Sequence, residues 1–416
     1  MPFNAINRRH KSGTAEARRF FYDAFILPFK DQSRAYIYIT SMLFAFGTAF
    51  LEMFILLDFA DLPKMDMMYF LFIRFFIGTI IVCSIFYLIS RHGGRVIYPY
   101  ILGVIVAALF YYALLMNPNS PLQVALMLGL ISSPFWGIYH VLFAITASKE
   151  NLGNEVSIAS TGMTIGTTIG FAAGGIFAQY EFQTLALCTG FLATALSIFM
   201  LVAYAYKIRL KKNLQESGLL DETLGQAADR CRYRSLGAGF DGVLQLCGGN
   251  LWVIYLSLAG ISATAVGLWN AIMVLIKIIF TPIAGTLVNH GRRREMVLGS
   301  IVQTAGWAPF LIPSAFVLPA MYVWSVGYQL FITGLNSTWY STRTVSSLLL
   351  REMILGATRL ISIPLLVPLL YLDPVYFIIV TLIISALTIF YSLRWMKSIK
   401  DKYKGPVLAI ANNVAP

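Results

Sequence analysis

A few ionisable side chains stand inside long apolar stretches of this 416-residue chain, namely Glu52, Arg74, Lys277 and Arg359. A charged side chain within lipid costs at least about 2.5–3.5 kcal/mol, so each one needs a structural or functional reason. Three cations against one clear acid give this interior a positive bias. The bias favours an organic anion or a zwitterion over a cation as the bound solute.

Glu52 and Arg74 each stand eleven residues from Pro63, which centres the turn between two apolar stretches. In an antiparallel helical hairpin, equal distances from the turn give equal depths, so we predict an ion pair. Two roles stay open, a structural pair or a contact with substrate or proton. If Glu52 carried a proton, Arg74 would be left unpaired, which could couple protonation to anion release.

Lys277 lies near the middle of its apolar stretch with no acid within one helical turn. We expect it to reach a central cavity, another helix or the interface, and it is our first choice for function, with a buried structural pair as the alternative. Arg359 has Glu352 seven residues earlier on a similar helix face, and a structural network with the loop between the tenth and eleventh spans is favoured over substrate contact. His140 follows Trp136 by one turn and either carries a proton or hydrogen-bonds near a helix end.

The composition places these residues in a bilayer. Apolar residues make up 58% of the chain and charged residues 12%, whereas soluble domains carry about 25% charged residues. Stretches suited to spans of about 20 residues occur in two sets of six, at 35–57, 68–90, 96–116, 122–146, 157–178, 184–206, 238–259, 264–288, 296–314, 317–340, 347–371 and 374–394. We therefore predict an all-α integral membrane protein with twelve transmembrane helices in two six-helix bundles, 35–206 and 238–394. A segment 1–34, a linker 207–237 and a tail 395–416 complete the chain.

The basic residues predict how these helices are oriented. Of 31 Lys and Arg residues, 27 fall on the side that holds both termini and the linker. Because cytoplasmic loops carry the Lys and Arg excess, we place that side in the cytoplasm. The formal net charge of +12 then indicates contact with anionic lipid, and nucleic acid is not expected as a partner. An amphipathic interfacial helix is predicted at 14–29, and no signal peptide is expected.

The loop after the eighth predicted span contains glycines and arginines at close spacing, Gly285, Asn289, Gly291, Arg292 and Arg293. It resembles the signature loop of the major facilitator superfamily, glycine-x-x-x-acid-basic-x-glycine-basic-basic. Asn289 replaces the acid, and one spacer residue is missing. Such a loop combines a tight glycine turn with arginines that can bond helix C-termini. The resemblance implies a cytoplasmic gating latch.

The loop after the second predicted span is a weaker copy of that signature, with Arg91, Gly93 and Arg95. A signature loop in each half, together with the six-plus-six pattern, implies a major facilitator transporter. Two similar halves also place a substrate site near the midplane and imply alternating access. The resemblance further implies a functional monomer, and we expect no cofactor and no metal.

Glycines four residues apart line one face of the fifth predicted span, at Gly166, Gly170 and Gly174. Such spacing lets a neighbouring helix approach closely, and packing is the favoured interpretation. In the major facilitator family, a similar run with proline at the Phe171 position marks many antiporters. The resemblance gives a hint toward proton-coupled antiport or efflux.

The family resemblance implies that spans one, four, seven and ten line the cavity. The seventh then supplies Asp241, Gln245 and Asn250, and the tenth supplies Tyr328 and Gln329. Aromatic rings with a few amides suit an amphipathic organic solute. Tyrosines and tryptophans that anchor the membrane interface are the alternative interpretation.

We therefore predict a secondary active transporter for a small organic solute, an anion or zwitterion, in a plasma or bacterial inner membrane. No G-x-x-x-x-G-K-[ST] loop for ATP occurs in the sequence. An integral-membrane acyl- or glycosyltransferase is the first alternative, but no catalytic pair can be assembled from neighbouring residues, so we expect no enzyme. A transporter-like lipid flippase or receptor is the second alternative.

Overall fold

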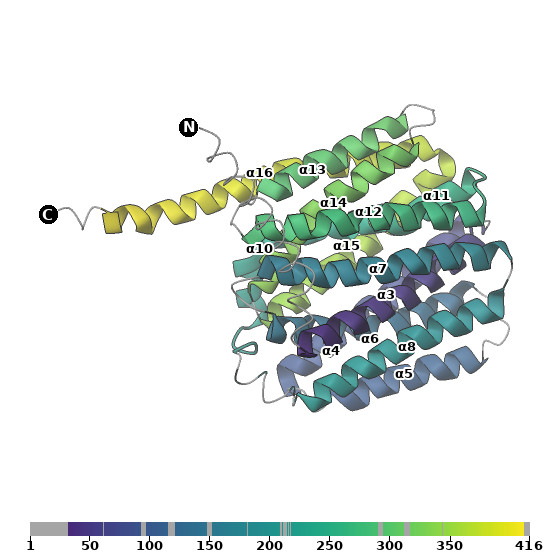
Figure 1. Cartoon of the computed structure of the whole chain (residues 1–416), viewed down its shortest axis with the longest axis horizontal. Coiled ribbons are helices and arrows are strands. Elements are labelled where there is room, and N and C mark those ends of the chain that lie inside the picture. The colour runs from purple at the N-terminus through teal and green to yellow at the C-terminus, as the bar shows by residue number, and fades with distance from the viewer. Residues whose placement is uncertain are drawn as a thin grey trace, which may run out of the picture.

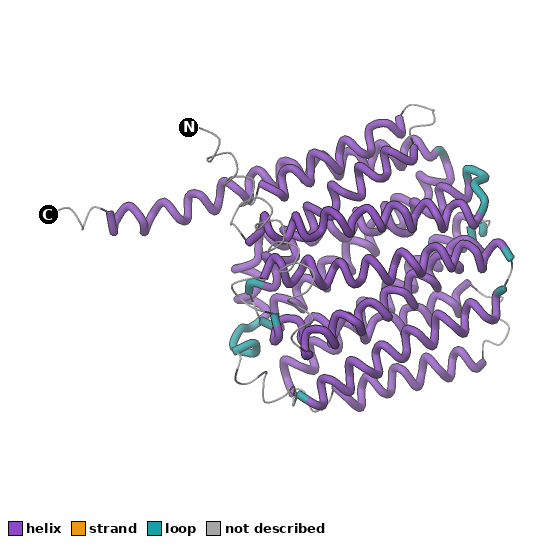
Figure 2. Tube along the Cα trace, in the orientation of Figure 1, coloured by secondary structure: helices purple, strands orange, loops and turns teal. Residues whose placement is uncertain are grey.

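The structure is a computed structural model. It describes residues 32–60, 62–92, 97–114, 121–147, 152–180, 182–208, 210, 214, 216, 218–289, 294–311, 317–342 and 344–411. Helices dominate this part of the chain, and it contains no strand (Figure 2). The predicted interfacial helix at 14–29 lies outside the described residues.

Helix follows helix through the described parts of the chain (Figure 1). In the first half they are α3 (Gln32–Asp58), α4 (Lys64–His92), α5 (Ile97–Leu114), α6 (Pro121–Thr146), α7 (Leu152–Gln179) and α8 (Gln183–Lys207). In the second half they are α10 (Leu224–Gln245), η2 (Leu246–Leu251), α11 (Trp252–Leu258), α12 (Ala263–Asn289), α13 (Arg294–Trp307), η3 (Ala308–Leu311), α14 (Val317–Tyr340), α15 (Val345–Leu372) and α16 (Pro374–Ala411).

Helix α10 begins at Leu224, inside the segment that the sequence predicts as a linker. Its start is a capping box, because Thr223 accepts from the backbone N–H of Gln226 and the Gln226 side chain accepts from the backbone N–H of Thr223. The helix then widens into the π-helical segment η2 before continuing as α11. At the other end of the chain, α16 continues to Ala411, past the predicted start of the tail at 395.

Within the described residues, eight helices are long and apolar enough to cross a membrane. They are α3, α4, α6, α7, α8, α12, α15 and α16. Large apolar side chains on their outer faces are exposed, for example Phe199 at 64%, Ile279 at 66% and Phe390 at 69%. Exposure of this much apolar surface to water is unfavourable, whereas lipid tails solvate it. The chain is therefore a multi-pass membrane protein.

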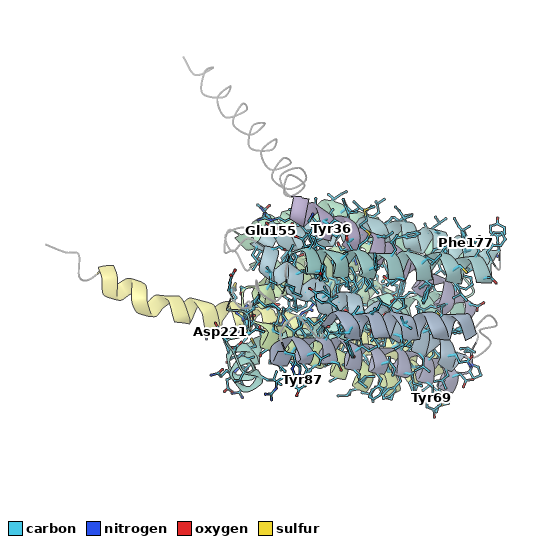
Figure 3. The ribbon with its side chains drawn as sticks, turned by 90° about the horizontal axis from the view of Figure 1, so that it is seen from below. Tyr36, Tyr69, Tyr87, Glu155, Phe177 and Asp221 are labelled. Atoms are coloured by element: carbon cyan, nitrogen blue, oxygen red, sulfur yellow. The ribbon has the colours of Figure 1, made fainter. Side chains whose placement is uncertain are left out.

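The two ends of the helix bundle are distinct. The chain enters α3 and leaves through α16 at one end, called the proximal end here, and the opposite end is called the distal end (Figure 1). Figure 3 shows Glu155 and Asp221 at the proximal end and Tyr69 and Phe177 at the distal end. Helices α3 to α8 pack mainly among themselves, as do α10 to α16. The main contacts between the two groups join α7 to α12 and α4 to α15.

Glycines bring α7 into backbone contact with α3 and α12. A Cβ on Gly170 would lie 2.6 Å from the carbonyl oxygen of Phe46 in α3. A Cβ on Gly175 would lie 2.7 Å from the Cα of Gly267 in α12. The glycine stripe of this helix therefore packs against α3, as its spacing predicts, and its distal end also packs against α12.

Candidate functional site

A cavity of about 480 Å³ lies between the two groups of helices. Its walls come from α3, α4, α6 and α7 on one side and from α10, η2, α12, α14 and α15 on the other. This volume is in the range of small-molecule sites. Eight of the nine candidate residues chosen from the sequence line it: Glu52, Arg74, Gln245, Asn250, Lys277, Tyr328, Gln329 and Arg359.

Lys277 projects from the middle of α12 toward aromatic rings of α14. Its Nζ atom lies 5.8 Å from the ring centroid of Trp324 and 5.6 Å from that of Tyr328. These two rings are stacked, with centroids 5.4 Å apart. In the part of the chain that the structure describes, no carboxylate forms an ion pair with Lys277. The ring faces attract the ammonium group without neutralising its charge.

Glu52 of α3 and Arg74 of α4 form the predicted ion pair, which lines the distal part of the cavity. The pair uses Arg74 Nη2, and the buried Nη1 has no hydrogen-bond partner among the described residues. Arg74 is buried at 6% exposure, while its partner is partly exposed. The pair therefore leaves one donor of the guanidinium group available.

Polar side chains of α10, α14 and α15 form a hydrogen-bonded group in which Gln245, Tyr328 and Arg359 line the cavity and Asp241 does not. Asp241 Oδ1 accepts a hydrogen bond from Tyr328 Oη at 2.6 Å and from Gln245 Nε2 at 2.9 Å. The other end of the Gln245 amide accepts a hydrogen bond from Arg359. The sequence predicts a structural network of Arg359 with the loop between the tenth and eleventh spans. In the structure Arg359 bonds to Gln245 and lines the cavity, whereas Glu352 pairs with Arg351.

His140 of α6 meets α14 and α15 on the proximal side of the cavity. Its Nδ1 atom lies 2.5 Å from Tyr340 Oη, and its Nε2 atom lies 3.4 Å from Glu352 Oε1. Glu352 also binds Arg351 at 2.5 Å, and Arg351 donates to Asn336 at 2.9 Å. His140 is buried and is not part of the cavity wall. His140 therefore connects the two groups of helices on the proximal side of the cavity.

Other amides and glycines that line the cavity come from η2 and α14. Asn250 belongs to η2, and Gln329 donates to Thr333 Oγ1 at 3.3 Å. Gly248 of η2 packs directly on the Trp324 ring, where a Cβ atom would overlap the ring. The π-helical segment thus supports the aromatic pair that contacts Lys277.

Neither a family model nor a curated protein sequence matches the chain. Solved structures do. A bacterial homologue of the iron transporter ferroportin aligns with a TM-score of 0.61 at 17% identity, over 87% of this chain and 98% of that one. The human organic anion transporter MFSD10 (TETRAN) aligns with a TM-score of 0.63 at 12% identity, over 86% of this chain and 98% of that one. The xylose transporter XylE from E. coli aligns with a TM-score of 0.55 at 13% identity, over 86% of this chain and 97% of that one. All three are major facilitator transporters.

The chain has the major facilitator fold. At these identities the likeness concerns the fold alone. It agrees with the expectation drawn from the two glycine-arginine loops, even though each loop departs from the family signature. The coverage of almost the whole length of each solved chain means that the similarity includes both groups of helices.

The predicted gating loops of this major facilitator fold lie partly outside the described residues. Gly93, Arg95, Gly291, Arg292 and Arg293 belong to the undescribed segments, as does the side chain of Asn289. Of the others, Arg91 stacks over the Tyr87 ring at 5.9 Å, and a Cβ on Gly285 would lie 2.7 Å from the carbonyl oxygen of Gly153. Gly285 therefore allows α12 to cross the start of α7 closely.

Two acids in and beside the cavity were not selected from the sequence as site residues. Asp241 was named only as a polar group of a lining helix, and Glu352 only as a partner of Arg359. Asp241 stands four residues before Gln245 on the same helix face, which is the signal that could have found it. Among the described residues in and beside the cavity, four cations, Arg74, Lys277, Arg351 and Arg359, now accompany three carboxylates, Glu52, Asp241 and Glu352. One positive charge is in excess.

Proposed function

We propose that the chain is a secondary active transporter that moves a small organic anion or zwitterion across a membrane by alternating access. The observation that carries this proposal is Lys277, a cation on the cavity wall that contacts aromatic rings and forms no ion pair with a described carboxylate. A partly buried cation of this kind gains most from an anionic partner. One structurally similar protein is a human organic anion transporter, which is compatible with this proposal.

The aromatic content of the cavity supports a substrate with an apolar or aromatic body. Rings from both groups of helices line it, including Phe44, Trp136, Phe171, Trp324 and Tyr328. Amides at Gln245, Asn250 and Gln329 add hydrogen-bonding groups between the rings. A substrate whose acidic group meets Lys277 while its body meets the rings satisfies both features.

The proposal includes the topology predicted from the basic residues. The chain crosses the bilayer twelve times in two six-helix bundles, with both termini and the linker at 207–237 in the cytoplasm. The proximal end is then the cytoplasmic end. We further propose that the transporter acts as a monomer in a plasma or bacterial inner membrane and couples transport to protons.

A thermal-stability screen of the purified protein tests the substrate class. Organic acids are compared with amines and alcohols that share the same carbon skeleton, for example benzoate, benzylamine and benzyl alcohol. A ligand that binds only the folded protein raises stability by RT ln(1 + [L]/Kd), so about 100 Kd of ligand adds about 2.7 kcal/mol. We expect acids to stabilise the wild type and to have little effect on Lys277→Ala.

Lys64→Ala is the matched control, because Lys64 is an exposed lysine at the distal end of α4, outside the cavity. It should respond to the acids as the wild type does. If only amines or alcohols stabilise the wild type, and Lys277→Ala responds equally, Lys277 is structural and the proposed substrate class is wrong.

A further inference from the structure

Asp241 is a buried carboxylate whose two oxygen atoms have different surroundings. The residue has 0% exposure. Both of its hydrogen-bond donors, Tyr328 Oη and Gln245 Nε2, bind the same oxygen atom, Oδ1. Oδ2 is buried and has no hydrogen-bond partner within the described chain. Buried polar atoms nearly always have such a partner, so the free oxygen calls for an explanation.

The charged groups around Asp241 neutralise it incompletely. Arg351 of α15 is the nearest cation, with Nη2 4.0 Å from Oδ2, but its Nη1 binds Glu352 at 2.5 Å. Arg359 of α15 reaches Asp241 only through the Gln245 amide. From α14, Tyr328 is the titratable group in contact, and from α16, Tyr391 packs one turn away at Gly237.

The other two carboxylates of the cavity region differ from Asp241 in this respect. Glu52 binds Arg74 directly, and Glu352 binds Arg351 directly. A proton added to either of them would compete with an arginine in contact. A proton added to Oδ2 of Asp241 displaces no hydrogen bond, because that atom makes none with the described residues. Asp241 is thus the carboxylate of this region that has no arginine within hydrogen-bond distance and whose second oxygen atom is buried without a hydrogen-bond partner among the described residues.

Two side chains connect Asp241 with the cavity. Tyr328 donates its hydroxyl to Asp241 and presents its ring to Lys277 at 5.6 Å. Gln245 donates its amide to Asp241 and accepts from Arg359, which lines the cavity. A change of charge at Asp241 therefore alters the electrostatic energy of Lys277 and Arg359, because the distances are short and the medium has a low dielectric constant.

We propose that Asp241 is the proton-binding residue of this transporter and that its protonation favours binding of an organic anion at Lys277. This inference rests on the proposed function. Protonation turns the carboxylate into a neutral acid, which raises the positive excess around the cavity from one charge to two. By linkage, a bound anion favours the protonated form to the same extent. Proton and anion then travel in the same direction, so this charge balance supports cotransport instead of antiport.

Infrared spectroscopy of the reconstituted protein tests the proton site without any substrate. The wild type should gain a carboxylic-acid carbonyl band as the buffer is changed from alkaline to acidic, and Asp241→Asn should lack that band. Glu155→Gln is the matched control, because Glu155 is also buried and accepts from a tyrosine, Tyr38, at 2.6 Å, but it pairs with Arg34 at 2.5 Å. The control should keep the band.

If Asp241→Asn does not fold, Asp241→Glu replaces it. A glutamate keeps the carboxyl group but moves it, so the band should remain at a shifted frequency. A band that persists in Asp241→Asn, or an unshifted band in Asp241→Glu, overturns the assignment. So does a band that is lost in Glu52→Gln and retained in Asp241→Asn, because Glu52 would then carry the proton.

Binding of benzoate at neutral and acidic pH tests the coupling. Coupling free energies between sites correspond to factors of about 5–150 in affinity, so we expect the wild type to bind benzoate at least about fivefold more tightly in acid. Asp241→Asn should bind with the tighter affinity at both pH values. Equal pH dependence in wild type and Asp241→Asn overturns the coupling. If the wild type binds no organic acid at all, the proposed function fails, while the infrared result still decides the proton site.

Discussion

Lys277 lies against aromatic rings, and no described carboxylate pairs with it. Its neighbours Trp324 and Tyr328 present ring faces to the ammonium group, and such contacts contribute about 0.5–2 kcal/mol. Trp324 is itself buried, at 2% exposure, and packs against Trp307. The rings are thus held in place by the core of the second group of helices, and the position of Lys277 depends on them.

Gly248 provides the space for this arrangement. A Cβ atom there would overlap the Trp324 ring, whereas the neighbouring Gly249 has no heavy atom within 4 Å of a Cβ position. Overpacking a buried site costs about 1–3 kcal/mol, so Gly248→Ala should lower the free energy of unfolding by about that amount. It should also weaken anion binding. Gly249→Ala should do neither. Thermal unfolding of both variants in detergent checks this, and equal shifts would show that the Trp324 contact is not the cause.

The residues of the site could be predicted from the sequence as far as their types decide the matter. An ionisable or amide side chain in an apolar stretch is itself a signal, and this signal found Lys277 and the Glu52–Arg74 pair. The partner of Arg359 could not be found this way. Its guanidinium group reaches Gln245 on another helix, 114 residues away in the chain, and a side chain's reach across helices is not encoded in its local spacing.

Helix α7, together with the α4–α15 contact, joins the two groups of helices. It packs against α3 through Gly166, Gly170 and Gly174, and it meets α12 at both ends, through Gly175 at the distal end and through Ser157 at the proximal end. Small residues on two sides let the helix contact both neighbours by backbone. Relative motion of the two groups during alternating access would have to slide or open this contact.

Substitution at the distal crossing should therefore be costly. A Cβ on Gly175 would lie 2.7 Å from Gly267 Cα and 2.7 Å from the Ala263 carbonyl oxygen, and neither backbone atom can rotate away. We expect Gly175→Ala to reduce the free energy of unfolding by about 1–3 kcal/mol.

Gly162 of the same helix is the matched control, since its Cβ would be 3.5 Å from the nearest atom, an ordinary contact. Gly162→Ala should be close to neutral. Thermal unfolding of the two variants side by side decides the matter, and a Gly162→Ala loss as large as that of Gly175→Ala would point to a general effect on α7 instead of the crossing.

Most element boundaries could be predicted because an apolar run ends where a span ends. Helix α10 extends beyond its apolar run, because it begins at Leu224, fourteen residues before the predicted span at 238. The first turns of α10 carry Asp229, Arg230, Arg232 and Arg234, so no apolar run marks them. Their start is set by the capping box at Thr223 and Gln226, a local signal that a search for apolar stretches does not use.

At the scale of the whole molecule, contacts between the two groups of helices occur on both sides of the cavity. On the proximal side, His140 contacts Tyr340 and Glu352. On the distal side, Tyr371 of α15 donates to the Leu62 carbonyl oxygen, in the turn after α3, at 3.2 Å. Alternating access requires that one of these sets breaks while the other holds. The polar His140 contacts and the Asp241 carboxylate share Arg351, so a proton at Asp241 would also act on the proximal set.

Uptake into proteoliposomes tests the central claim most directly. Vesicles that contain the wild-type protein, with an inward proton gradient, should accumulate labelled benzoate, or the acid that stabilises the protein most, above the level of protein-free vesicles. Lys277→Ala should reduce this uptake to the protein-free level, and Lys64→Ala should retain it. Uptake by Lys277→Ala at the wild-type rate, or uptake of the matched amine in place of the acid, would contradict the account.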